Sequence, residues 1–238
     1  MGKILRSQPF PNLRDFRLWC EEHEPWDDHS QPQNYQDECG DVFSTGVRRL
    51  CGLPYLHTLW LCRNIVLSPE AFTADESTDA VFSPSLRIVY IEFSVTTPDG
   101  KWYFTGDPSA PYEVESWRTD AGDPPVLFRD RPDDDLLVPL VSSLARAIRR
   151  MPALRILKLR LIYSGRRIHF EVHYFADGVS PNFGLPRNAT SFLRSRAGAR
   201  CFVDIGYGWA PSPSLKKAFI AISGDEETTM LNIRSDED

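Results

Sequence analysis

The chain has 238 residues, of which 42% are hydrophobic and 25% charged, and its formal net charge is −6. This composition is that of a folded globular protein with a sizeable core. The negative charge and the scattered basic residues do not form the stripe typical of nucleic-acid-binding proteins, so no nucleic-acid partner is expected. We see no signal peptide and no apolar run of ~20 residues, and therefore expect a cytoplasmic or nuclear protein with no membrane partner.

A short pattern recurs five times: a proline, any residue, a leucine, two residues, an apolar residue, one residue and another apolar residue. The copies begin at Pro11, Pro54, Pro84, Pro152 and Pro213. The two apolar residues face the same side of a strand, and proline belongs before a strand because it cannot donate to the sheet. Since one such face cannot be buried alone, five strands are predicted to stack in parallel, as in a solenoid.

The second copy matches the leucine-rich repeat consensus best, through Leu56, Leu59, Leu61, Asn64 and Val66. The other four copies lack the asparagine. Successive anchoring leucines lie 43, 30, 68 and 61 residues apart, whereas regular repeats run at ~20–29 residues, so large insertions are required. The alternative, that Pro-x-Leu before a strand is simply common in α/β proteins, stays open.

Apolar spacing predicts a helix over Leu136–Met151, capped by Asp133 and its neighbours, and a shorter one over Ser44–Gly52. Alternating residues predict strands over 167–175 and 200–207, which shift the C-terminal part towards a mixed or antiparallel sheet. Two long segments, 21–41 and 107–135, are predicted loops. The expected fold is α/β: one irregular leucine-rich-repeat-like domain over 1–224, followed by an acidic tail over 225–238.

Candidate chemistry centres on His169, Glu171 and His173, which alternate along one predicted strand and share a face. A metalloprotease motif needs Glu directly after the first His on a helix, so an ordinary solvated or loop-covered strand face is predicted. The alternative function is an enzyme with its site there or under the 107–135 loop.

Four possible zinc ligands lie in or beside the first loop, but they lack the two tight pairs of a structural site: Cys20, His23, His29 and Cys39. Neither a metal nor a cofactor is expected, and no catalytic residue is assigned. The five cysteines are odd in number and widely spread, which predicts reduced thiols.

The run from Leu136 to Leu159 resembles a segment in the repeat region of fungal F-box proteins, and the runs 62–70 and 97–104 are similar to other stretches of that group. The resemblance implies a protein-recognition scaffold like the substrate-recognition part of a ubiquitin-ligase receptor, with an unknown protein target. Repeat-like sequence begins by Pro11 and leaves no room for an F-box. We therefore expect no direct contact with the ligase adaptor.

The predicted binding surface follows from the alternation of side chains in the repeated strands. Residues between and just after the apolar pair point away from the core, and the large or basic ones are Arg17, Trp19, Trp60, Tyr90, Lys158, Arg160 and Phe219. Exposed aromatics beside basic residues are typical of interaction hot spots. The alternative is that the insertion carrying Trp102, Tyr103 and Phe104 folds over this face and makes it a second core.

Overall fold

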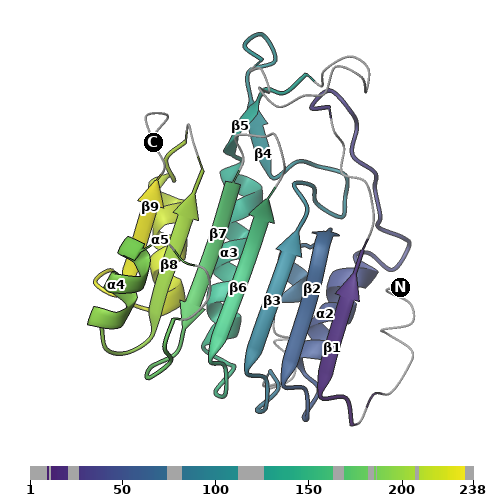
Figure 1. The fold of residues 1–238 in the computed structure, drawn as a ribbon. Coiled ribbons are helices and arrows are strands. Elements are labelled where there is room, and N and C mark those ends of the chain that lie inside the picture. The colour runs from purple at the N-terminus through teal and green to yellow at the C-terminus, as the bar shows by residue number, and fades with distance from the viewer. Residues whose placement is uncertain are drawn as a thin grey trace, which may run out of the picture.

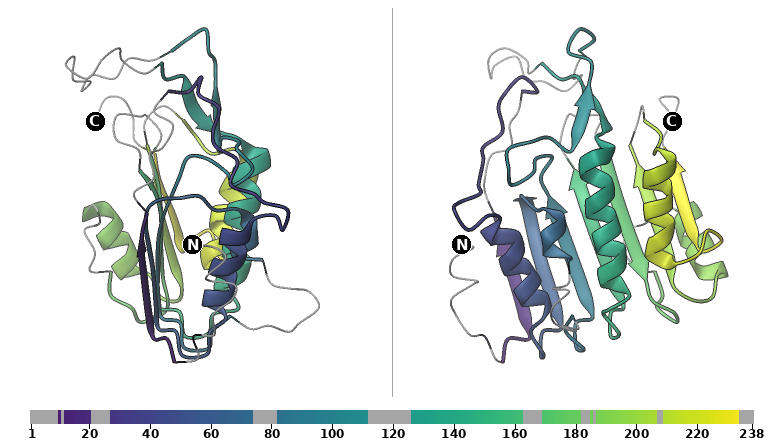
Figure 2. Two further views of the ribbon diagram at one scale, coloured as in Figure 1. Left: turned by 90° about the vertical axis from the view of Figure 1, so that its right-hand side faces the viewer. Right: turned by 180° about the vertical axis from the view of Figure 1, so that it is seen from behind.

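A seven-stranded sheet carries helices α2, α3 and α5 on one face and helix α4 on the other (Figures 1 and 2). The computed structural model describes residues 10, 12–20, 27–73, 82–111, 126–162, 169–181, 185, 187–206 and 209–233. In spatial order the strands are β1 (Asp15–Trp19), β2 (Thr58–Ile65), β3 (Ile88–Phe93), β6 (Ile156–Ile162), β7 (His169–Phe175), β8 (Arg200–Ile205) and β9 (Thr229–Ile233).

The first four strands are parallel, β7 runs antiparallel to both of its neighbours, and β9 is parallel to β8. The α/β class and the change to a mixed sheet are therefore confirmed. Because β9 belongs to this sheet, the predicted tail boundary is wrong: residues 229–233 form an edge strand. No helix in the described part of the chain is both long and apolar enough to cross a membrane.

Four of the five repeated units form neighbouring strands of the sheet, in chain order. β1, β2, β3 and β6 come from the first four copies and pair without any other strand between them. Leu59 aligns with Val89, and Val89 with Leu157, so equivalent apolar positions form one continuous row under the helices. The pattern thus predicted these four strands and their parallel stacking, and the structure adds their register.

The same turn precedes each of these strands. The anchoring leucine donates its N–H to the carbonyl three residues earlier, in the pairs Leu13–Phe10, Leu56–Leu53, Leu86–Ser83 and Leu154–Met151, at 3.0–3.3 Å. Pro54, Pro84 and Pro152 therefore occupy the second position of a β-turn, which their fixed φ favours. The repeated proline starts a turn whose closing leucine fixes where the strand begins.

The fifth copy is not a strand, and this part of the prediction is wrong. Pro213 is the first residue of helix α5 (Pro213–Ser223), and the Ser212 side chain caps it by accepting from the Leu215 N–H at 3.1 Å. Leu215, Ala218, Phe219 and Ile222 are buried at helical spacing. Phe219, predicted to point away from the core, is instead fully buried in it.

Helices α2 (Val42–Cys51) and α3 (Asp134–Ile148) confirm the two predicted helices, each beginning a little earlier than expected. Asp41 caps α2 by accepting from the Ser44 N–H, and Asp133 caps α3 by accepting from the Asp135 N–H. A single 3-10 turn, η1 (Pro69–Ala71), packs beside α2.

The aromatic residues of the insertion after β3 pack on the helix side of the sheet. Trp102, Tyr103 and Phe104 are buried in the helix-side core, where the Tyr103 hydroxyl donates to the Leu67 carbonyl at 2.5 Å. Strand β4 (Phe104–Gly106) then pairs with β5 (Arg129–Pro132) in a separate small sheet. The alternative that these aromatics form a second core over the strand face is wrong.

The loop expected over 21–41 is packed against the rest of the domain in its described part. Asp28 is buried, and its carboxylate accepts from the backbone N–H groups of Phe128 and Arg129, both at 2.7 Å. The Tyr35 N–H donates to the Pro98 carbonyl at 2.8 Å. These bonds hold residues 27–37 against the segments that flank β4 and β5.

Helix α4 (Arg187–Ser195) lies alone on the opposite face, over the β8 end of the sheet (Figure 2). It buries a small second cluster made of Phe175, Val179, Ala189, Leu193 and Phe202. We call the sheet face on this side the open face, because α4 is the one described helix on it.

Candidate binding surface on the open face of the sheet

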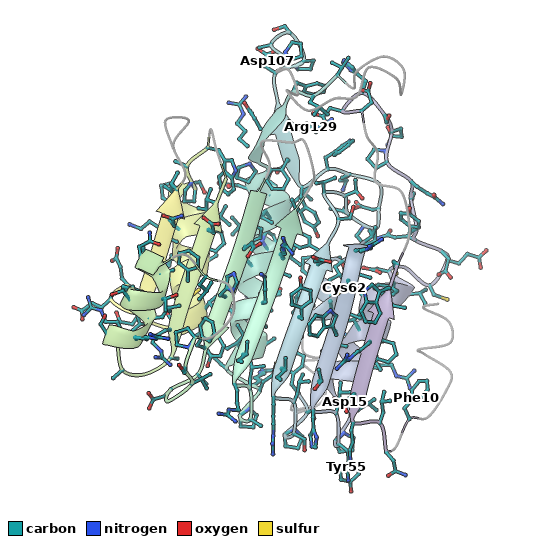
Figure 3. All side chains as sticks on the ribbon, viewed as in Figure 1. Phe10, Asp15, Tyr55, Cys62, Asp107 and Arg129 are labelled. Carbon is teal, nitrogen blue, oxygen red and sulfur yellow. The ribbon has the colours of Figure 1, made fainter. Side chains whose placement is uncertain are left out.

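The register places four of the predicted binding residues in one row across the open face. Arg17 aligns with Trp60, Trp60 with Tyr90, and Tyr90 with Lys158; the row then continues to His173 and Phe202. Figure 3 looks onto this face. The prediction that these side chains share one face is confirmed for Arg17, Trp19, Trp60, Tyr90, Lys158 and Arg160, while Phe219 lies in the core on the other side.

The centre of the row is an aromatic stack. The rings of Trp60 and Tyr90 are stacked with centroids 4.5 Å apart and an interplanar angle of 26°. Arg17 lies 5.7 Å from the Trp60 ring and Lys158 lies 5.9 Å from the Tyr90 ring. Each outer ring face is thus occupied by a cation, which leaves the ring edges for a partner.

Trp19 extends this surface towards the edge of the sheet. Its side chain is 55% exposed, and among the described large hydrophobic side chains only that of Tyr55 is more exposed. Its neighbour on β2 is Cys62, a buried thiol that accepts a hydrogen bond from the indole N–H of Trp60. Burial raises the pKa of the Cys62 thiol, so this sulfur is a packing partner for Trp60 rather than a reactive thiolate.

Beside the aromatic stack lies a network of ion pairs centred on Glu171. Its carboxylate lies 3.0 Å from Lys158 Nζ and 2.8 Å from His173 Nε2. Arg160 Nε lies 2.8 Å from the other carboxylate oxygen, as an ion pair without hydrogen-bond geometry, and Arg160 also pairs with Glu92 at 3.1 Å. The Tyr90 hydroxyl donates to Glu92 at 3.0 Å and joins the stack to this network.

Burial and these contacts together shift the pKa values of groups in the network. Burial raises the pKa of the Glu171 carboxyl, but hydrogen bonds from His173 and Lys158 outweigh it and hold the pKa at about 2. Burial lowers the pKa of His173, against the opposing effect of its bond to Glu171. Burial also raises the pKa of Tyr90 to about 12. At neutral pH the network therefore contains a carboxylate, a neutral phenol and a neutral imidazole.

His173 is only 4% exposed, and its ring lies beside those of Phe175 and Phe202. The expected ordinary strand face is therefore partly buried here. The His169 side chain, and residues 112–125 of the loop considered as an enzyme site, lie outside the described residues. Lys158, Arg160 and His173 all contact the two carboxylate oxygens of Glu171. Glu171 therefore holds these side chains in place and is not free to act as a general base.

A backbone irregularity in β2 shapes the upper border of the face. The pairing of β2 with β3 shifts register between Leu61 and Ile65, and Arg63 adopts a positive φ of 62°. The Arg63 N–H donates to Glu92 at 3.1 Å, while its side chain is exposed. The bulge lies in the segment that carries Asn64, whose side chain lies outside the described atoms.

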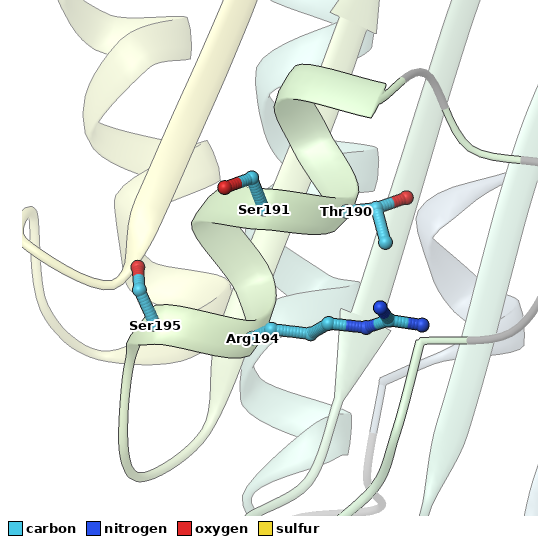
Figure 4. Close-up of a pocket in the computed structure, with 4 residues that line it drawn as sticks. All are labelled: Thr190, Ser191, Arg194 and Ser195. Atoms are coloured by element: carbon cyan, nitrogen blue, oxygen red, sulfur yellow. The ribbon is translucent and has the colours of Figure 1, made fainter.

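Helix α4 borders the face on the side of β7 and β8. A hollow of about 510 Å³ is lined by four residues of this helix: Thr190, Ser191, Arg194 and Ser195. Figure 4 shows Thr190 and Arg194 on one side of the helix and Ser191 and Ser195 on the other. All of the described lining residues come from one short helix, so we do not assign a ligand site to this hollow.

The sequence placed Glu92 among the positions that point away from the core, and Glu171 on one face of its strand, but neither was counted among the predicted binding residues. Glu92 follows the apolar pair of its strand, in the same position as Arg160 in the next repeated strand. Glu171 comes from β7, which is not a copy of the repeat and reaches this face through the antiparallel pairing with β6. The signal in the sequence was that Glu92 and Glu171 carry the charge opposite to that of Arg160, and opposite charges are favoured at neighbouring positions on adjacent strands.

No family model, no curated protein and no solved structure matches this chain.

Proposed function

We propose that this chain is a protein-recognition scaffold that binds its target with the open face of the sheet. The observation that supports this most directly is the Trp60–Tyr90 stack, held between Arg17 on β1 and Lys158 on β6. Rigid aromatic side chains beside basic ones are the typical anchors of protein interfaces. The ion pairs around Glu171 fix the neighbouring side chains and so prepare this surface for binding.

The proposed architecture is an irregular leucine-rich-repeat-like solenoid with long insertions. Its support is the recurrence of one turn, one anchoring leucine and one register in four neighbouring parallel strands. Such scaffolds present a continuous strand surface to a partner. The sequence resemblance to the repeat region of F-box proteins supports a role in selecting protein substrates for a ubiquitin ligase.

The test compares capture by three purified forms of the chain from an extract of the native organism. The Trp60→Ala/Tyr90→Ala variant should lose proteins that the unaltered chain retains. Tyr55→Ala is the matched control, because Tyr55 is equally aromatic and 56% exposed but lies in the turn before β2 (Figure 3). Equal capture by all three forms, measured by quantitative mass spectrometry, would reject the open face as the binding surface.

A further inference from the structure

A second surface lies at the amino ends of the same four strands. The residue directly after each anchoring leucine is basic: Arg14, His57, Arg87 and Arg155. The residues that follow them, Asp15, Thr58, Ile88 and Ile156, are register partners on adjacent strands. The four basic residues therefore lie side by side across the lower edge of the sheet in Figure 1, and we call them the basic row.

Direct backbone hydrogen bonds connect the members of the basic row. The His57 N–H donates to the Arg14 carbonyl at 2.6 Å, the Arg87 N–H to the His57 carbonyl at 2.8 Å, and the Arg155 N–H to the Arg87 carbonyl at 2.9 Å. Neighbouring strands lie ~4.8 Å apart, so the row spans roughly 14 Å. These bonds fix the spacing of the four side-chain attachment points.

The charges of the basic row are not compensated within the described part of the chain. Arg14, Arg87 and Arg155 are exposed, and no described carboxylate lies within ion-pair distance of any of the four. Arg87 and Arg155 lie on adjacent strands, and like charges at neighbouring positions of a sheet repel each other and destabilise it. The sequence expectation of scattered basic residues is thus wrong at this edge, because the fold brings together residues that are far apart in the chain.

We infer that the basic row binds a short acidic segment of a protein partner. Carboxylates three and four residues apart on a helix have their Cβ atoms ~5–6 Å apart, close to the ~4.8 Å repeat of the row. At a rise of ~1.5 Å per residue, about ten helical residues cover its length. Each exposed arginine can then take one carboxylate, while the backbone needs no rearrangement.

The charge distribution favours a short peptide over a long polyanion. The turn between α5 and β9 lies at the same end of the sheet and carries Asp225, Glu226 and Glu227, and the whole chain has a net charge of −6. A nucleic acid or an anionic membrane extends past the basic row and meets this negative charge. A short acidic segment contacts the row alone, because charges beyond ~8 Å are largely screened in physiological salt.

The experiment measures fluorescence anisotropy of a labelled poly-glutamate peptide of about ten residues, a length set by the span of the row. The test variant is Arg14→Gln/Arg87→Gln/Arg155→Gln, and glutamine keeps most of each side chain. The charge-matched control is Arg63→Gln/Arg131→Gln/Arg194→Gln, which removes three other exposed arginines. Thermal melting checks that both variants are folded.

The expected result is saturable binding that weakens with added salt and is reduced about tenfold in the test variant, since each exposed ion pair contributes a factor of roughly two to three. The control variant, and the Trp60→Ala/Tyr90→Ala variant, should bind the peptide as the unaltered chain does. No binding, or equal loss in test and control variants, overturns the inference. Equal affinity for a single-stranded oligonucleotide or for phosphatidylserine vesicles also overturns it, because the row would then bind any polyanion.

Discussion

Trp60 and Leu61 are neighbours in the chain but lie on opposite faces of β2. Leu61 is fully buried beneath the helices, whereas the indole of Trp60 stacks on Tyr90 across the open face. The two positions therefore separate the core of the domain from the proposed binding surface. Their substitutions give a direct comparison of the two roles.

Leu61→Ala should lower the free energy of unfolding by about 2–5 kcal/mol, since it leaves a cavity in a packed core. Trp60→Ala should cost less, about 1–2 kcal/mol, because it removes one aromatic stack and one cation–π contact from a half-buried site. Urea unfolding of both variants measures the difference. If the Trp60 variant is as unstable as the Leu61 variant, the open face is part of the core and the proposed function loses its main support.

Asp28→Ala should destabilise the attachment of residues 27–37. The substitution leaves the buried N–H of Phe128 and the partly buried N–H of Arg129 without the carboxylate that accepts from both, which costs about 2–4 kcal/mol. Amide hydrogen exchange should show faster exchange at Phe128 and Arg129. Asp28→Asn retains one acceptor and should have a smaller effect; unchanged exchange in the alanine variant would contradict the structure here.

Stability should fall in acid because of Glu171 and His173. The pKa of Glu171 lies at about 2 in the fold, below its ordinary value of 4.5, so the stabilisation is complete above pH 4.5 and is lost as the pH falls towards 2. The lowered pKa of His173 acts in the same direction, beginning below its ordinary value of 6.5, because the unfolded chain takes up the proton first.

Glu171 alone accounts for up to about 3 kcal/mol, at 1.36 kcal/mol per pKa unit. Urea unfolding between pH 7 and pH 3 should show about 2 kcal/mol of this fall, since the rest is lost only as the pH approaches 2, and Glu171→Gln should flatten it. The same pH dependence in the variant would mean that other carboxylates cause it.

Ser212→Ala should reduce stability by about 1 kcal/mol, because Ser212 supplies the acceptor for the Leu215 N–H at the start of α5. Ser85→Ala is the matched control: it is also a serine in a Ser-Pro-Ser-Leu run, but it lies within a turn. A change below about 0.5 kcal/mol is expected there, as for a substitution that removes no cap or core contact. Similar losses in both variants would show that the cap contributes nothing specific.

The Ser-Pro-Ser-Leu run also shows what a local sequence motif cannot predict. Ser83 to Leu86 and Ser212 to Leu215 are identical, yet the first run turns into strand β3 and the second begins helix α5. The residues that follow decide the outcome: Ile88, Val89 and Ile91 favour a strand, whereas Ala218, Phe219 and Ile222 complete a helical apolar face. A local motif identified the start of an element but not its type.

The shared face of Trp60, Tyr90 and Lys158 was predictable because alternation along a strand is a local property. The contacts of Glu171 were not, since they depend on the antiparallel pairing of β7 with β6. The basic row was also hidden, because Arg87 and Arg155 become neighbours only once the sheet forms. For Glu171 the missing information was which strand pairs with β6, and this depends on contacts between residues far apart in the chain. For the basic row the parallel stacking was predicted, but the basic residue after each anchoring leucine was not compared between the copies.

The position of β6 beside β3 has a kinetic consequence. The anchoring residues Leu86 and Leu154 are 68 residues apart in the chain, yet their strands pair directly in the middle of the sheet. Closing so long a loop costs chain entropy before any contact across it forms, and a high average sequence separation between contacts slows folding. The antiparallel pair β6–β7 and the parallel pair β2–β3 each join strands close together in the chain, so we expect them to form first, separately. The pairing of β3 with β6, which joins them, should then limit the folding rate.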